Sequence, residues 1–185
     1  MKTLLSTLAL GAVLSTFGSA ALAATPAADL ALQNGGGIRA GLPAGAITYG
    51  DVLTMLPFGN TLATAVLRGG HLLVALENGL SQPGAGRFPQ VAGLRLVVDL
   101  SAPPGQRIVS AEVTRGERAG PLDPERAYRI VTNNFIRQGG DGYTALRDHA
   151  LEAYDSGPLM EEVVAAHLTT LAPLAPRLDG RIRTR

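Results

Sequence analysis

The sequence predicts an α+β fold in a single domain, with a mixed β-sheet flanked by helices. Segments with leucines at helical spacing intermix with short segments rich in valine, isoleucine and threonine, which is typical of a domain whose helices and strands are interleaved. Two of the strand-like segments are separated only by a turn of proline and glycine, which indicates hairpin neighbours. The chain has 185 residues and no internal repeat, so its length suits one domain with its own core.

The expected elements alternate along the chain. In order they are a strand over 29–33, a helix over 49–56, a strand over 60–67, a helix over 68–80, strands over 94–100, 107–114 and 128–134, and a helix over 158–171. Each strand segment is short, apolar and bounded by turn-forming residues. The stretch 81–89 contains two glycines and two prolines, so it is expected to be a loop.

Each expected helix has its own signal. Thr48, with Asp51 three residues later, forms a capping-box pattern, and Pro57 ends the helix that follows. The second helix has leucines at positions 72, 73, 76 and 80, which is helical spacing. The third has an apolar stripe of Leu159, Met160, Val163, Val164, His167, Leu168 and Leu171. Glu161 and Glu162 lie near its start, where the helix dipole favours negative charge, so we assign them a structural role.

The first 23 residues have the pattern of a secretory signal peptide. Lys2 supplies the positive charge, residues 4–17 are mostly apolar, and Ala21-Leu22-Ala23 fits a small-residue cleavage site. The alternative is an N-terminal membrane anchor, but serine, threonine and glycine dilute a stretch that is already short for one. We therefore expect a periplasmic or secreted protein with no membrane segment after cleavage.

The remaining boundaries follow from composition. After the signal peptide at 1–23, residues 24–28 form an alanine- and proline-rich spacer, 29–171 form the domain, and 172–185 form an arginine-rich tail. The tail has no aromatic residue, so it is expected to be a solvated end of the chain and not a binding site.

Composition argues against several classes of function. Lys2 is the only lysine, and 15 arginines oppose 15 acidic residues in the rest of the chain, which argues against a nucleic-acid partner. There is no cysteine and therefore no disulfide. His71, His149 and His167 are far apart and lack acidic neighbours at metal-ligand spacing. With no nucleophile elbow and no phosphate-binding lysine loop either, we expect no catalytic residue, metal or cofactor in this chain.

Three glycine-rich motifs in a fixed order are the main functional signal. They cover residues 34–39 (Asn-Gly-Gly-Gly-Ile-Arg), 57–60 (Pro-Phe-Gly-Asn) and 134–143, which begins Asn-Phe and ends Gly-Gly-Asp-Gly-Tyr. They place aromatic rings, amides, an arginine and a carboxylate beside flexible backbone. This matches a nucleotide pocket, in which rings stack on a base, polar groups bind ribose and a guanidinium binds phosphate.

Each motif also has a structural interpretation. Residues 35–40 match the dinucleotide-binding glycine pattern, but the glycines and proline of 41–45 would break the helix that such a fold requires. A tight turn remains, as does an anion site of backbone N–H groups beside Arg39. Phe58 could belong to the core, although loop aromatics often bind ligands. Asp141 could simply shape a turn.

Together with Gly-x-Ile-Thr-Tyr at 45–49 and Gly-x-Phe-Pro-Gln at 86–90, the motifs resemble the C-terminal domain of the bacterial 5′-nucleotidase / UDP-sugar hydrolase family. The resemblance runs from about residue 29 to about residue 171 and implies a substrate-recognition role. It implies a base held between Phe58 and Phe135, ribose hydroxyls held by Asp141, and Arg39 near ribose or phosphate. The other substrate contacts that it implies are Asn34, Asn60 and the backbone of Gly86.

In that family the chemistry belongs to an N-terminal metallophosphoesterase domain with two divalent metal ions and an Asp–His pair, and the two domains rotate to close on substrate. This chain shows no such domain, and the helix that normally opens the C-terminal domain is expected to be missing, which would expose apolar surface.

We therefore expect nucleotide or nucleoside recognition, as the substrate-binding half of a 5′-nucleotidase-family hydrolase in nucleotide catabolism. A separate metallophosphoesterase chain is a candidate partner. The alternative is a non-catalytic structural or interaction module that has kept the fold and lost the ligand. A hydrolase with a hidden site ranks last.

Overall fold

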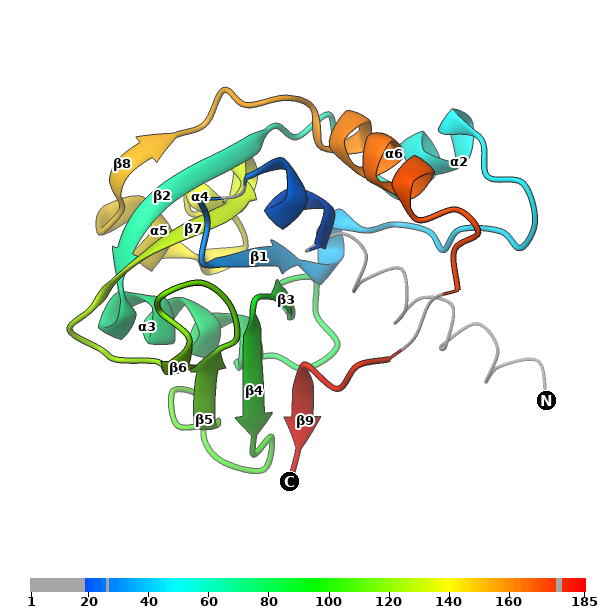
Figure 1. Cartoon of the computed structure of the whole chain (residues 1–185). Coiled ribbons are helices and arrows are strands. Elements are labelled where there is room, and N and C mark those ends of the chain that lie inside the picture. The colour runs from blue at the N-terminus through cyan, green and yellow to red at the C-terminus, as the bar shows by residue number, and fades with distance from the viewer. Residues whose placement is uncertain (1–18, 26, 176–177) are drawn as a thin grey trace.

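Two mixed β-sheets form the framework of the protein (Figure 1). The computed structural model describes residues 19–25, 27–175 and 178–185. The larger sheet has the strand order β3-β1-β7-β2-β8, and the smaller has the order β6-β5-β4-β9. The strands are β1 (Leu30–Asn34), β2 (Leu62–Arg68), β3 (Pro89–Ala92), β4 (Leu94–Val98), β5 (Ile108–Val113), β6 (Gly120–Pro121), β7 (Ala127–Asn133), β8 (Leu151–Tyr154) and β9 (Ile182–Thr184).

Helices cover both faces of the larger sheet. They are α2 (Tyr49–Met55), α3 (Gly69–Leu80), α4 (Asn134–Arg137), α5 (Thr144–Asp148) and α6 (Met160–Thr170), with short 3-10 turns η1 (Gly35–Gly37) and η2 (Gly140–Gly142). Side chains of α3 and α5 pack in one hydrophobic core together with the smaller sheet. Side chains of α2 and α6 pack in a second core on the opposite face, and the two helices lie side by side in Figure 1.

Strand β1 shows how a central strand serves both cores. Leu30 and Leu32 belong to the first core, whereas Ala31, between them, belongs to the second. Successive side chains of a strand point to opposite faces of the sheet, so a strand covered on both faces is apolar at every position. The whole of β1 is buried, with β3 antiparallel on one side and β7 parallel on the other.

The predicted α+β fold with a mixed sheet is confirmed, although the structure has two sheets. Each predicted strand and helix is present, with bounds that differ by a few residues at most. The predicted capping box is also confirmed. The Asp51 amide donates to the Thr48 hydroxyl over 3.2 Å, and the Thr48 amide donates to the Asp51 carboxylate over 2.8 Å.

Two segments that were predicted to be irregular contain strands. The expected loop 81–89 ends in β3, which begins at Pro89 and pairs with β1. The expected solvated tail contains β9, which pairs with β4 in parallel, and Arg181 donates to the Val91 carbonyl over 3.1 Å. Both errors have the same cause, because a sheet neighbour supplied from elsewhere in the chain makes a strand of a segment with no strand pattern of its own.

The end of the predicted signal peptide is part of the structure. Residues 19–24 are helical, and Ala20, Ala21 and Leu22 are buried in the second core. The apolar face that was expected to be bare is therefore partly covered. Residues 1–18 of the predicted signal lie outside the described residues, and cleavage after Ala23 stays a prediction. Within the described part of the chain, no helix has the length and apolarity needed to cross a membrane.

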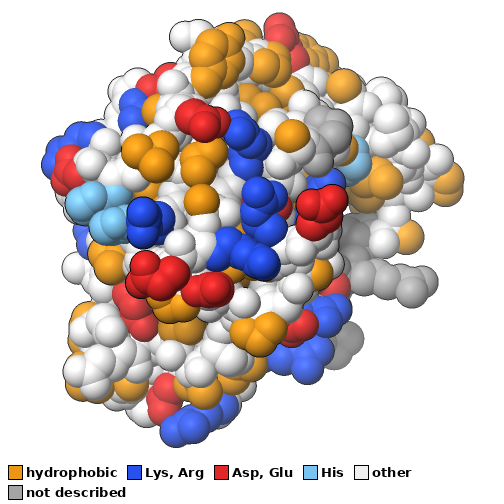
Figure 2. All heavy atoms as spheres, turned by 60° about the vertical axis from the view of Figure 1, so that its left-hand side comes forward, with side chains coloured by type: hydrophobic (Ala, Val, Ile, Leu, Met, Phe, Trp, Pro, Cys, Tyr) orange, Lys and Arg blue, Asp and Glu red, His pale blue; other side chains and the backbone are white. Residues whose placement is uncertain are grey.

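Arginines gather on the face shown in Figure 2, in a band bordered by acidic side chains. Three ion pairs balance charge at the surface. Arg68 lies 3.5 Å from Glu125, and Arg129 lies 2.8 Å from Glu152. Arg118 lies 3.2 Å from the buried carboxylate of Asp29. The two exposed pairs contribute little stability, but all three pairs offset the positive charge of these arginines.

Candidate functional site

The ends of two strands and one turn meet at the predicted site. Asn34 ends β1, and its amide donates to the carboxylate of Asp141 over 2.6 Å. Asp141 lies within η2, with a left-handed backbone (φ 54°) that aspartate tolerates better than most residues. The turn interpretation of Asp141 is thus correct, and the same turn places its carboxylate against a second predicted site residue.

The glycine run 35–37 packs directly against the predicted Gly86. The Gly36 amide donates to the Gly86 carbonyl over 2.7 Å, and a Cβ at position 36 would lie only 2.8 Å from the Gly86 Cα. The amides of Gly35 and Arg39 are also paired, with the carbonyls of Phe88 and Met55. The tight turn is therefore confirmed. The alternative of an anion site is wrong for the amides of Gly35, Gly36 and Arg39, because each of them already donates to a backbone carbonyl.

Phe135 presents an exposed ring next to Asp141. It lies in the first turn of α4, and the Asn133 side chain caps that helix by accepting from the Ile136 amide over 2.8 Å. The ring is 44% exposed and lies over Gly140, where a Cβ would come within 2.5 Å of the ring. Only glycine leaves room for the ring at this position.

Phe58 and Asn60 form a second cluster. Phe58 is 58% exposed, which excludes the alternative of a core aromatic. Both residues line a small hollow together with Gln33. The Asn60 carbonyl accepts from the first amide of α6, that of Met160, over 2.9 Å. Arg39 is exposed and pairs with no acidic side chain among the described residues.

A buried amide network joins these clusters, and it was not predicted. Asn133 donates to Gln33 over 2.6 Å and to Asn34 over 2.9 Å, and all three side chains are buried. Asn34 extends the network by donating a hydrogen bond to the Asp141 carboxylate. The only sequence signal was the pair Asn133-Asn134 at the end of an apolar strand, where polar residues are unexpected unless they serve a site.

Tyr143 fixes the turn that carries Asp141. Its side chain is fully buried, and its hydroxyl donates to the Arg87 carbonyl over 2.6 Å. Asn78 donates to the Asp141 carbonyl over 3.2 Å from α3. Burial, reinforced by the negative charge of Asp141, raises the pKa of the Tyr143 hydroxyl well above its ordinary value.

Tyr143→Phe should lower the free energy of unfolding by about 1 kcal/mol, because the Arg87 carbonyl loses its donor. The raised pKa also predicts a pH effect. The stabilising contribution of neutral Tyr143 is complete below the unfolded pKa of about 10 and is lost as the pH rises towards the folded pKa. Thermal melts between about pH 8 and 11 should therefore show a steeper alkaline loss of stability in the wild type than in Tyr143→Phe. Equal slopes would contradict this role.

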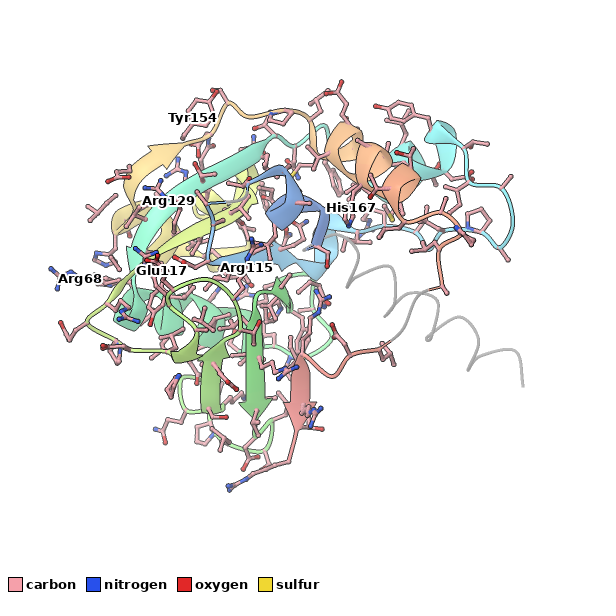
Figure 3. All side chains as sticks on the ribbon, viewed as in Figure 1. Arg68, Arg115, Glu117, Arg129, Tyr154 and His167 are labelled. Atoms are coloured by element: carbon pink, nitrogen blue, oxygen red, sulfur yellow. The ribbon has the colours of Figure 1, made fainter. Side chains whose placement is uncertain are left out.

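Two histidines that are distant in sequence stack in space. The rings of His71 and His149 have centroids 3.8 Å apart and an interplanar angle of 16°. His167 lies apart from them, on α6 (Figure 3). Across residues 19–25, 27–175 and 178–185, no group of three or more histidine, aspartate or glutamate side chains could hold a metal ion.

A large cleft lies away from the predicted site. It has a volume of about 730 Å³ and lies between α3 and β5, with Val74 and Val109 exposed at its walls. None of the seven predicted site residues lines it. The predicted site residues include two exposed rings, those of Phe58 and Phe135, and the partly exposed carboxylate of Asp141.

Residues 8–148 match the family model described as 5′-nucleotidase, C-terminal domain. The chain belongs to the 5′-nucleotidase C-terminal domain family. It is 42% identical over 161 residues to the trifunctional nucleotide phosphoesterase protein YfkN of Bacillus subtilis, which covers 84% of this chain and 11% of that protein. It is 34% identical over 164 residues to human 5′-nucleotidase, which covers 84% of this chain and 28% of that protein.

Solved structures agree with this membership. A 5′-nucleotidase precursor from Thermus thermophilus matches with a TM-score of 0.89 and 45% identity over 93% of this chain and 35% of that one. The NAD nucleotidase of Haemophilus influenzae matches with a TM-score of 0.80 and 26% identity over 94% of this chain and 33% of that one. The chain thus spans about a third or less of each of these four proteins. As a member of the 5′-nucleotidase C-terminal domain family it shares one part of their fold.

Proposed function

We propose that this chain recognises a nucleotide or nucleoside and acts as the substrate-binding half of a 5′-nucleotidase-family hydrolase in nucleotide catabolism. The observation that carries the proposal is the contact between Asn34 and Asp141 beside the exposed ring of Phe135. An exposed aromatic ring beside a fixed carboxylate offers a ligand both a stacking surface and a hydrogen-bond acceptor. Membership of the family supports the same role.

The side chains offer complementary groups for each part of a nucleotide. The exposed rings of Phe58 and Phe135 can each stack on a base. Asp141 accepts from Asn34 through one oxygen, and a carboxylate has further lone pairs for the vicinal hydroxyls of ribose. Arg39 is exposed and can form a bidentate contact with phosphate.

Catalysis by this chain would require a separate source of metal ions. Hydrolysis of phosphate esters near neutral pH needs an activated water, which bound metal ions commonly provide. We propose that a separate metallophosphoesterase chain supplies it, that the pair acts outside the cytoplasm after export, and that the open face bearing Phe58 and Phe135 turns towards that partner.

Calorimetric titration with AMP, adenosine and UMP tests the binding role. Two stacked rings contribute about 2–6 kcal/mol, so we expect dissociation constants of roughly millimolar. Absence of binding to all three ligands would instead favour the interaction module, for which the cleft between α3 and β5 is the available surface.

Asp141→Asn should remove the preference for ribose over deoxyribose ligands. The carboxylate accepts from two hydroxyls, whereas an amide presents only one acceptor oxygen. We expect the wild type to bind adenosine at least about threefold more tightly than 2′-deoxyadenosine, since one hydrogen bond is worth about 1 kcal/mol, and the variant to bind both equally. An equal loss for both ligands would show that Asp141 only shapes the turn.

Phosphate release from AMP and UMP with Mn²⁺, Zn²⁺ or Co²⁺ tests the catalytic part of the proposal. The isolated chain should release none. Turnover that survives repurification and disappears in an Arg39→Ala, Phe135→Ala double variant would overturn the binding-only role.

A further inference from the structure

Glu161 is a buried carboxylate without a complete set of partners. It is the second residue of α6 and is only 6% exposed, among apolar side chains of the second core. Its Oε2 atom is buried and has no hydrogen-bond partner among the described residues. A buried acceptor without a donor is costly. Packing in the core therefore does not explain why a carboxylate stands at this position.

The carboxylate lines a hollow beside Phe58. The hollow has a volume of about 10 Å³, and its walls are Gln33, Gly37, Leu56, Phe58, Asn60, Met160 and Glu161. That space holds one group the size of a water molecule. Phe58 and Asn60 are two of the predicted binding residues, so the unpaired acceptor lines the same hollow as the ring proposed to stack on a base.

The surrounding residues keep this acceptor in place. Glu161 lies at the N-terminal end of α6, a helix whose N-cap residue, Leu159, makes no side-chain capping hydrogen bond, and the dipole of that end favours negative charge. The start of α6 is tied to the Phe58 loop by the Met160 amide, which donates to Asn60, and by the bridge between Thr61 and Leu159. Gln33 accepts from Asn133 through its Oε1 atom, and no hydrogen bond from its Nε2 atom reaches the Glu161 Oε2 atom.

No donor among the described residues bonds to the Glu161 Oε2 atom, so a ligand can supply one. A base stacked on Phe58 presents the edge of its ring system to the neighbouring hollow. An exocyclic amino group has about the size of the hollow and would donate to the carboxylate, whereas a keto oxygen at the same position would face another acceptor. From this geometry we infer that Glu161 is a specificity-determining residue that reads an exocyclic amino group on the base. This inference rests on the proposed nucleotide-binding role.

The test compares three nucleosides that differ at the 6-position of the purine. Adenosine carries the 6-amino group, inosine carries a 6-keto group, and purine riboside carries neither. Calorimetry on the wild type should rank them adenosine, purine riboside, inosine, with adenosine at least about tenfold tighter than inosine, as expected for one hydrogen bond to a charged acceptor.

Glu161→Gln should abolish the ranking, because an amide can either donate or accept. Glu162→Gln is the matched control, since its side chain is the exposed neighbour and the ranking should survive the change. Equal affinity for adenosine and inosine in the wild type would show that the hollow holds a water molecule only, and would overturn the inference while the proposed function stands. Absence of binding to all three nucleosides would overturn both. The wild-type comparison decides the question even if Glu161→Gln does not fold.

Discussion

Asn133→Leu should lower the free energy of unfolding by about 3 kcal/mol or more and should also weaken nucleoside binding. Leucine removes the donor to Gln33 and Asn34 and the acceptor that caps α4. Each buried group left unpaired costs about 1–3 kcal/mol. Asn34 then no longer holds a fixed position against Asp141, so the loss extends to the ligand face. Urea denaturation and calorimetry with adenosine measure the two effects.

Thr132→Val is the matched control for this variant. Thr132 precedes Asn133 in β7 and is equally buried, but its hydroxyl has no hydrogen-bond partner among the described residues. Valine has nearly the same shape and removes only that unpaired group, so stability should stay the same or rise slightly. If Asn133→Leu costs no more than Thr132→Val, the amide network does not stabilise the site.

Phe135→Ala should weaken adenosine binding at least about tenfold, because a stacked ring contributes about 1–3 kcal/mol. Gly140→Ala should weaken it comparably without removing the ring, since the new Cβ would lie 2.5 Å from the ring and displace it. Phe58→Ala should have an effect of similar size for the second ring. Calorimetric titration measures all three variants.

Gly41→Ala is the control for the glycine variant. A Cβ at position 41 meets no atom within 4 Å, and its φ is not in the left-handed range, so binding should not change. Unchanged affinity in both phenylalanine variants would refute the stacking role. Unchanged affinity in Gly140→Ala alone would mean that the displaced Phe135 ring can still stack on the base.

The elements with local signals were predictable from the sequence. The capping box of α2 and the leucine spacing of α3 depend on residues a few positions apart, which any folded context preserves. Strands β3 and β9 depend on β1 and β4, which lie far away in the chain. Without knowledge of that pairing, a proline-rich loop and an arginine-rich tail give no sign of being strands.

The site likewise has residues that the sequence predicted and residues that it could not. The glycine-rich motifs predicted Asn34, Phe135 and Asp141, and the structure places them together. The roles of Asn133 and Glu161 could not be predicted, because each depends on which face of its element is buried. Glu161 and Glu162 look alike in sequence, yet one helical step buries the first and exposes the second. The seven predicted residues remain an assignment for mutagenesis to test.

The helix formed by residues 19–24 would connect cleavage of the predicted signal peptide to stability. Arg181, next to β9, donates to the hydroxyl of Ser19 over 3.3 Å, so the segment contacts the far end of the chain as well as the second core. Removal of residues 1–23 would take Ala20, Ala21 and Leu22 out of that core, in which Ala31 and Ile38 also pack. The chain with residues 1–23 and the chain without them would then differ in stability. Their resistance to proteases would differ as well, so it would show which of the two a cell contains.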